Sequence, residues 1–179
     1  AAVLVGLAGS HPAAAEPAPD APMGTVVVVH GLVDFPADVY LDGSSTPALS
    51  GFEFRRVTEP LALPAGTHRA DLRRAGDAAT AVPALSGTFD VVADQQVTVA
   101  ALSDADGTPR WLSFPDDAAV AEPSRAELRF RHFAAAGPVA VTIDGQTVLN
   151  GIANLAASAQ APPIRLAPGR YRIAVQDAA

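Results

Sequence analysis

One pattern of apolar and turn residues occurs twice along this chain, at an almost constant interval. The interval is 102 positions at first and 103 later, as subtraction gives for His30 and His132, Asp42 and Asp144, and Gly66 and Gly169. Alternate apolar positions recur in the same way, and they relate Val26, Val28, Val39 and Leu41 to Leu128, Phe130, Val141 and Ile143. The positions that alternate with these apolar residues, which we expect to point outward, differ between the two segments. Preserved core positions and turn glycines predict two copies of one domain, with no need for a shared active site.

The repeated pattern is built from short runs with β-type alternation, separated by Gly, Pro and Asp, and no stretch sustains a helical period. Asp42-Gly43 is typical of a tight hairpin turn, because both residue types tolerate positive φ. We expect the first run to be a central strand buried on both faces. The sequence therefore predicts an all-β chain of tandem immunoglobulin-like antiparallel β-sandwiches, with strands in the first copy at Thr25–His30, Asp38–Leu41, Thr67–Arg74, Phe89–Val92, Val97–Leu102 and Arg110–Phe114.

The predicted organisation has five parts. They are a signal-peptide remnant at 1–15, a linker at 16–24, a first sandwich at 25–114, a linker at 115–125 and an incomplete second repeat at 126–179. Matching stops at Ala179, which is equivalent to residue 76, so the last three strands of the first copy have no counterparts. A half sandwich leaves sheet edges unpaired. We expect either that the natural chain continues or that another chain completes the sheet.

The first fifteen residues predict export. Ala1–Ala8 is a short apolar run, and Ala13–Ala15 offers the small residues that signal peptidase accepts. A disordered leader rich in Ala and Pro is the alternative. No apolar run reaches the length of about 20 residues that a membrane span needs. We therefore expect an extracellular or cell-envelope location.

Charge and cysteine content exclude several classes of function. With 12 basic and 19 acidic residues the net charge is −7, which disfavours nucleic acid as a partner. The pairs Arg55-Arg56 and Arg73-Arg74 are interpreted as charges that protect strand edges. The chain has no cysteine, so disulfides, thiolate metal sites and nucleophilic thiols are excluded from these residues.

The segments that carry the repeat resemble a known family. The stretch VVVVHGLVDFPADVYLDG (26–43) and the later LPAG (63–66) resemble the bacterial DUF4397 domain, whose members carry a VVHxSPDAPxVDVYVDG segment and an LPAG turn. The segments FRH (130–132), VTIDG (141–145) and APGRY (167–171) look like a diverged second member. The sequence departs from the pattern at 31–33 and 134–137. The resemblance implies an exported β-sandwich domain of unknown function and supplies no catalytic residues.

No group of residues predicts a catalytic, cofactor-binding or metal site. His30 and His132 occupy equivalent positions, and we expect each to anchor its own loop by a hydrogen bond, with a metal or catalytic role as the alternative. His68 is expected on the core face. Asp104–Gly107 is interpreted as a solvated turn, with calcium binding as the alternative. Trp111 is expected in the core or at the junction between the domains.

These observations favour a noncatalytic, exported module of the cell envelope that acts in surface display, adhesion or protein recognition. Its partners would be cell-wall or surface proteins. The alternative is a domain that binds cell-wall glycan, which would present exposed aromatic side chains. An enzyme is the least supported class, because no acid/base pair or phosphate loop occurs.

Overall fold

The computed structural model describes residues 21–116, 124–154 and 164–178. The predicted signal-peptide remnant at 1–15 lies outside the described residues, as do most of the predicted linkers at 16–24 and 115–125. The described residues form strands, turns and irregular segments but no helix. Accordingly, this part of the chain contains no helix of the length and apolar character that crossing a membrane requires.

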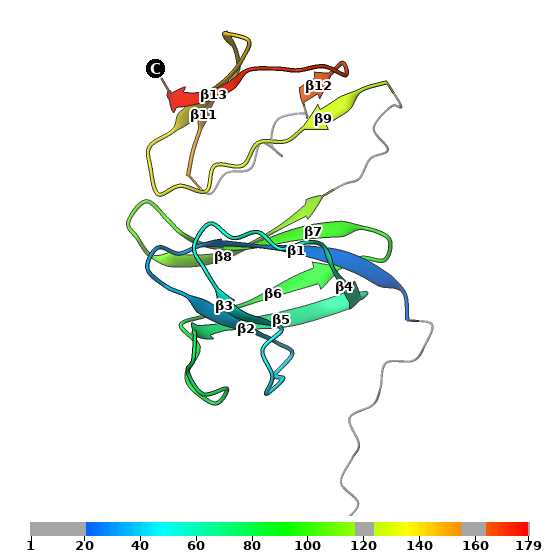
Figure 1. Ribbon diagram of the computed structural model, residues 1–179, viewed down its shortest axis with the longest axis vertical. Coiled ribbons are helices and arrows are strands. Elements are labelled where there is room, and N and C mark those ends of the chain that lie inside the picture. Colours follow the sequence, from blue (N-terminus) through cyan, green and yellow to red (C-terminus); the bar gives the residue numbers. More distant parts are fainter. Residues whose placement is uncertain (1–20, 117–123, 155–163, 179) are drawn as a thin grey trace, which may run out of the picture.

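Residues 23–116 form a sandwich of two four-stranded sheets, which Figure 1 shows one above the other. Sheet A has the strand order β4-β1-β7-β8, and sheet B has the order β3-β2-β5-β6. All neighbouring strands are antiparallel except β1 and β7, which are parallel. The strands are β1 Met23–Gly31, β2 Ala37–Leu41, β3 Leu49–Phe52, β4 Leu61–Pro64, β5 Gly66–Arg74, β6 Leu85–Val91, β7 Gln96–Ser103 and β8 Pro109–Asp116.

The core lies between the two sheets because alternate side chains of facing strands point inward. Sheet A contributes Val26, Val28 and Val99, and sheet B contributes Leu72 and Phe89, all of them buried. The sequence shows this alternation of apolar residues. It fixes the pairing register of the strands, because a shift of one residue would turn each apolar face to solvent.

Two expectations about the strands are wrong. The run at Thr25–His30 is central in its sheet, but only one of its faces is buried; the strand that is buried on both faces is β7. Strands β3 and β4 were not predicted, because LSGF and LALP contain no β-branched residue and give little β signal. Pairing of β3 with β2 is also irregular, and Gly51 there has a φ of 57°.

The described residues of 126–154 and 164–177 form two smaller sheets, which we call the C-terminal sheet and the ribbon. The C-terminal sheet has the order β11-β10-β13, and the ribbon pairs β12 with β9. Both lie beyond the outer face of sheet A in Figure 1. Their strands are β9 Ala126–Leu128, β10 Val139–Ile143, β11 Gln146–Ile152, β12 Ile164–Leu166 and β13 Ile173–Asp177.

The strand pairing of this C-terminal part corresponds to pairing in the sandwich at the intervals found in the sequence. In β2 and β5 the pairs run from Ala37↔Arg74 to Leu41↔Ala70, and in β10 and β13 they run from Val139↔Asp177 to Ile143↔Ile173. Adding 102 to the first number and 103 to the second converts each of the five pairs. The three pairs of β9 with β12 correspond in the same way to pairs of β1 with β4.

The turns correspond as well. Asp42 and Asp144 both have positive φ, at 51° and 49°, and each precedes a glycine with positive φ. Each aspartate also accepts a backbone N–H through its carboxylate, from Arg69 at 2.8 Å and from Arg172 at 2.9 Å. The turn predicted at Asp42-Gly43 is therefore present, but it does not close a tight hairpin, because β3 begins only at Leu49; Asp144-Gly145 connects β10 directly to β11 in a tight hairpin.

Candidate functional site

His30 is a buried residue near the end of β1, and it holds the following loop in place. Its Nε2 lies 2.6 Å from the Phe35 carbonyl oxygen, and its Nδ1 accepts the Leu32 N–H at 3.4 Å. The ring stacks on Phe52 with centroids 5.6 Å apart. Burial lowers the pKa of His30 and outweighs the opposing contact with the Phe35 carbonyl. The ring is thus neutral near pH 7, and both nitrogens are engaged by the backbone.

His132 makes the equivalent contact in the C-terminal part. It is buried, and its Nε2 lies 3.0 Å from the Gly137 carbonyl oxygen, again five residues further on. Each histidine therefore anchors its own loop, as expected. Among the described residues, no three His, Cys, Asp or Glu side chains come together in a way that could hold a metal ion.

A groove of about 550 Å³ lies between the sandwich and the C-terminal part, beside the loop that His30 anchors. Its size falls in the range of about 300–1,000 Å³ that is typical of ligand sites. Apolar side chains dominate its walls, and they are Val29, Val33, Phe54, Leu102 and Phe133. Ser103 also lines it, yet the histidine beside the groove has no nitrogen left to act as a base for that hydroxyl.

Arg55 is the one charged residue in the lining of this groove. It has a φ of 68°, which is unusual for a residue other than glycine. Two backbone hydrogen bonds hold its segment against β1: the Arg55 N–H donates to the His30 carbonyl at 2.8 Å, and the His30 N–H donates to the Arg56 carbonyl at 3.0 Å. The guanidinium lies 5.3 Å from the Phe54 ring centroid and forms no ion pair with a described residue.

The far wall of the groove is positioned by Arg131. This residue takes the place that Val29 has in the first copy of the sequence pattern. Its guanidinium forms an ion pair with Asp116 at the end of β8 and lies 5.1 Å from the Phe114 ring centroid. Two residues further on, Phe133 packs against Phe114 with centroids 5.5 Å apart. These contacts join the C-terminal part to sheet A and bring Phe133 to the groove.

The sequence interpretation of the arginine pairs needs correction. Arg55 and Arg56 belong to no strand but to the loop between β3 and β4, whose backbone bonds to His30 of β1. Arg73 and Arg74 lie in β5, which is a central strand between β2 and β6. The two departures from the family pattern, at 31–33 and at 134–137, were the sequence signals near the groove, because Gly31, Val33, Ala134 and Ala135 are among the lining residues.

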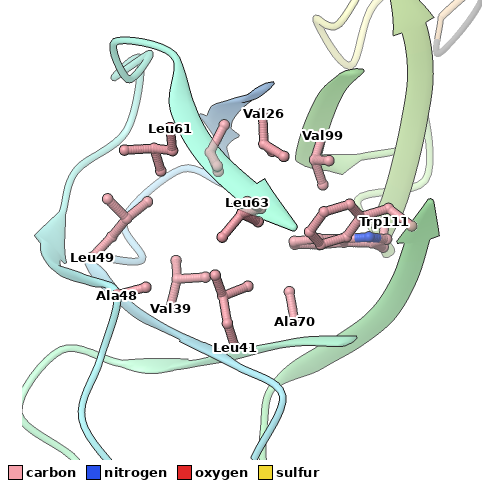
Figure 2. A pocket seen from close by; sticks show the side chains of 12 residues that line it. Val26, Val39, Leu41, Ala48, Leu49, Leu61, Leu63, Ala70, Val99 and Trp111 are labelled. Atoms are coloured by element: carbon pink, nitrogen blue, oxygen red, sulfur yellow. The ribbon is translucent and has the colours of Figure 1, made fainter. Parts of the chain in front are cut away.

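A second space inside the sandwich is a packing gap. Figure 2 shows it between the two sheets, lined by aliphatic side chains, Phe89 and Trp111. Its volume is about 20 Å³, which is room for one water molecule and too little for a ligand. Trp111 reaches it from β8 and packs against the core, as expected, although its buried Nε1 finds no hydrogen-bond partner there.

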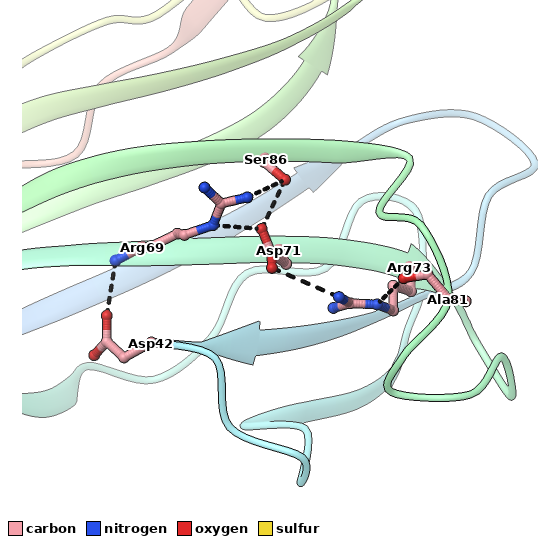
Figure 3. Close-up of polar contacts among 6 residues, drawn as sticks. All are labelled: Asp42, Arg69, Asp71, Arg73, Ala81 and Ser86. Atoms are coloured by element: carbon pink, nitrogen blue, oxygen red, sulfur yellow. Dashed lines mark hydrogen bonds and ion pairs between the residues drawn. The ribbon is translucent and has the colours of Figure 1, made fainter.

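The polar residues on the outer face of sheet B form a structural network (Figure 3). Asp71 accepts hydrogen bonds from Arg69 Nε at 3.0 Å and Ser86 Oγ at 2.6 Å, and it lies 3.6 Å from the Arg73 guanidinium. Arg73 in turn donates to the Ala81 carbonyl at 2.7 Å. Burial would raise the pKa of Asp71, but Ser86 and the two arginines lower it. The carboxylate is committed to this network and is not available as a catalytic base.

The remaining polar candidates, Asp104 and His68, have structural roles in a turn and in ion pairs. Asp104 caps its own turn by accepting the Thr108 N–H at 2.8 Å and pairs with Arg110 at 2.9 Å. His68 stacks on the core residue Phe89 and binds Asp42 through Nδ1 at 2.7 Å. The groove is therefore the best candidate for a binding site in the described part of the chain.

Comparison with known proteins gives one result. The family described as "Domain of unknown function (DUF4397)" matches residues 24–142, which is more than half of the chain. No curated protein matches. The matched segment contains the sandwich, Arg131 and Phe133, so it includes both walls of the groove.

Proposed function

Because the chain belongs to the DUF4397 family, which has no assigned function, we propose from its surface that it is a noncatalytic recognition module of the cell envelope that binds a polypeptide partner. The observation that carries this proposal is the groove with apolar walls and one cation that has no described acidic partner. Such a site fits an apolar peptide segment that bears a carboxylate.

The proposal includes a second, immunoglobulin-like copy of the domain at residues 126–179. The matching intervals in strand pairing support it, as do the equivalent histidine and aspartate contacts. The envelope location rests on the sequence of residues 1–15, which lie outside the described residues. N-terminal sequencing of the protein from fractionated cells tests it, and a cytosolic chain that keeps these residues would contradict it.

A noncatalytic role is supported by the groove lining, which contains no carboxylate and a histidine whose two nitrogens bind the backbone. Glycan binding is less well supported. Carbohydrate sites need exposed aromatic faces, and Phe54 is the single aromatic among the large apolar side chains that are exposed in the described residues.

The groove is tested with two tripeptides, acetyl-Leu-Val-Phe with a free carboxylate and the same peptide as its amide. We expect the full chain to bind the acid at least about tenfold more tightly, because a guanidinium–carboxylate contact contributes about 1.5–3 kcal/mol. Titration followed by amide NMR shifts measures both affinities and identifies the residues that the peptides contact.

Arg55→Gln should abolish the preference for the acid, because it removes the charge and keeps much of the side-chain volume. Arg110→Gln is the matched control, since Arg110 is also exposed but pairs with Asp104 outside the groove. Equal binding of acid and amide by the unaltered chain, or no binding of either, would refute the proposal.

A further inference from the structure

We propose that Asn150 is a site of spontaneous covalent modification, at which the backbone nitrogen of Gly151 displaces the side-chain amide and converts the asparagine to aspartate and isoaspartate. The chain holds two asparagines, Asn150 and Asn154, and only the first precedes a glycine. Glycine favours this reaction, because it has no side chain to block the attacking nitrogen and its backbone adopts many conformations. The inference depends neither on the groove nor on any partner.

The reaction balances with water as its co-reactant. The Gly151 nitrogen loses its proton to hydroxide and attacks Cγ of Asn150, so that a new N–Cγ bond forms and the bond from Cγ to Nδ2 breaks as ammonia leaves. Water then adds to one of the two carbonyl carbons of the cyclic imide and breaks the bond from that carbon to the ring nitrogen. Opening at Cγ gives aspartate, and opening at the backbone carbonyl gives isoaspartate. No atom is oxidised or reduced.

The two reacting residues lie in a bulge of β11. The register of β10 with β11 shifts at this point, so Asn150 and Gly151 together lie opposite the single residue Ala140. Gly151 has a φ of 70°, in the region that favours glycine, and both residues are exposed. The bulge therefore places the reacting dipeptide outside the regular ladder, where water and hydroxide reach it.

The sandwich contains the corresponding bulge with a restraint added. Ser50 and Gly51 of β3 lie opposite Asp38 of β2, and Gly51 also has a positive φ, 57°. There, Oδ1 of Asp38 accepts the Gly51 N–H at 2.8 Å. A carboxylate at this distance opposes loss of the proton, because deprotonation would create a second negative charge beside it. The hydrogen bond also holds the Gly51 nitrogen toward β2.

The C-terminal sheet lacks this restraint. Ala140 stands at the position that corresponds to Asp38, and its methyl side chain accepts no hydrogen bond. The Gly151 N–H therefore has no carboxylate to hold it as Asp38 holds Gly51. The change from Asp to Ala and the change from Ser to Asn occur in the same bulge, and together they make the second copy reactive where the first is not.

The modified protein should keep its strand pairing. Isoaspartate adds a carbon to the backbone, but the addition falls where the bulge already leaves residues outside the ladder, between the pairs Val139↔Ile152 and Val141↔Leu149. Either product adds one negative charge to the net charge of −7. We therefore expect a folded product that ion exchange separates from the original protein.

The test uses the full chain, incubated in mildly alkaline buffer and sampled over days. The tryptic peptide 132–165 contains both asparagines, and its fragmentation in a mass spectrometer shows which of them has exchanged an amide NH₂ for a hydroxyl. We expect the change at Asn150, in two chromatographic forms, and none at Asn154 over the same period. Asn150→Gln should prevent it, because the longer side chain would have to close a larger and less favoured ring.

Ser50→Asn is the matched variant, because it places the same dipeptide in the bulge where Asp38 holds the Gly51 N–H. Ser50 is exposed, so the replacement disturbs no core contact. In the folded chain the new asparagine should convert at least about tenfold more slowly than Asn150, because a restrained nitrogen cannot reach the attacking geometry. In concentrated urea, where neither nitrogen is held, the two rates should become similar.

Two outcomes overturn the proposal. If Asn150 keeps its amide for as long as Asn154 does, the bulge protects the dipeptide instead of exposing it. If both dipeptides of the folded Ser50→Asn chain convert at equal rates, the missing carboxylate plays no part. Emission of Trp111 checks that each variant is folded before the rates are compared.

Discussion

Gly87 in β6 is the position where a single methyl group should most disturb the sandwich. A Cβ atom at Gly87 would lie 2.1 Å from Trp111 Cδ1 and 2.3 Å from Cγ. Ordinary contact begins at 3.4 Å, so the indole would have to move by the difference between 3.4 and 2.1 Å, or 1.3 Å. Its path is limited, because the ring also contacts Phe89 at a centroid distance of 6.4 Å.

Gly87→Ala should therefore lower the free energy of unfolding by about 1–3 kcal/mol, the usual cost of overpacking a core. The cavity of about 20 Å³ beside Trp111 can absorb only part of the displacement. Urea denaturation followed by fluorescence measures the loss, and Trp111 is the only tryptophan of the chain, so its emission reports on the sandwich alone.

The matched control is Gly137→Ala, since a Cβ at Gly137 meets nothing within 4 Å and its φ is not positive. We expect this variant to be unchanged or more stable by up to about 1 kcal/mol, because alanine restricts the unfolded chain. If Gly87→Ala unfolds at the same urea concentration as the unaltered chain, with the same emission maximum, the packing argument is wrong.

Two further predictions use equivalent positions as controls. Burial favours the neutral forms of both His68 and Asp42, but other contacts outweigh it. Contact with the Pro64 carbonyl and Asp42 raises the pKa of His68. The Arg69 N–H and His68 lower the pKa of Asp42. Asp42→Asn should thus lower the free energy of unfolding most between about pH 4 and pH 6.5, by up to about 1 kcal/mol. The loss should fade as acid protonates Asp42 or base deprotonates His68, and urea denaturation at several pH values measures it. Asp144→Asn is the control, because Tyr171 and not a histidine stands at the position that corresponds to His68, and the same pH dependence in both variants would contradict the role of His68. Leu72→Ala should lower the free energy of unfolding by about 2–5 kcal/mol, whereas Val175→Ala should lower it by less than about 0.5 kcal/mol, because Leu72 is buried and Val175 is exposed. Calorimetry measures both losses, and equal losses would mean that β13 is covered.

Alternation and turn chemistry accounted for most of the fold. The runs that became β2, β5 and β7 were predicted to within two residues, because β2 and β5 alternate apolar residues, β7 is a mainly apolar run, and each ends at a turn. The interval of 102 positions also located β10, through Val141 and Ile143. The short strands β3 and β4 escaped prediction because their pairing comes from the tertiary context and not from local propensity.

The groove could not be predicted from the sequence. Its walls come from Val29, Phe54, Leu102 and Phe133, which lie far apart in the chain and meet only after the C-terminal part joins sheet A. That joining depends on the ion pair of Arg131 with Asp116. In the sequence Arg131 was only an outward position that differed between the copies, and spacing does not reveal its partner.

The outward face of sheet B differs from the corresponding face of the C-terminal sheet in the polar contacts that it makes. Asp38 accepts the N–H groups of Gly51 and Gly76 at 2.8 and 3.0 Å, and the guanidinium of Arg73 lies 4.8 Å from the Tyr40 ring centroid. These contacts tie loops over the sheet and leave its polar groups satisfied.

The equivalent face of the C-terminal sheet carries none of these groups. Ala140, Thr142, Ala174 and Gln176 stand where the sandwich has Asp38, Tyr40, Asp71 and Arg73. Small neutral side chains cannot hold a covering loop by ion pairs. The two sheets therefore share their strand pairing and turn residues, while the outward contacts that tie loops over sheet B have no counterpart in the C-terminal sheet.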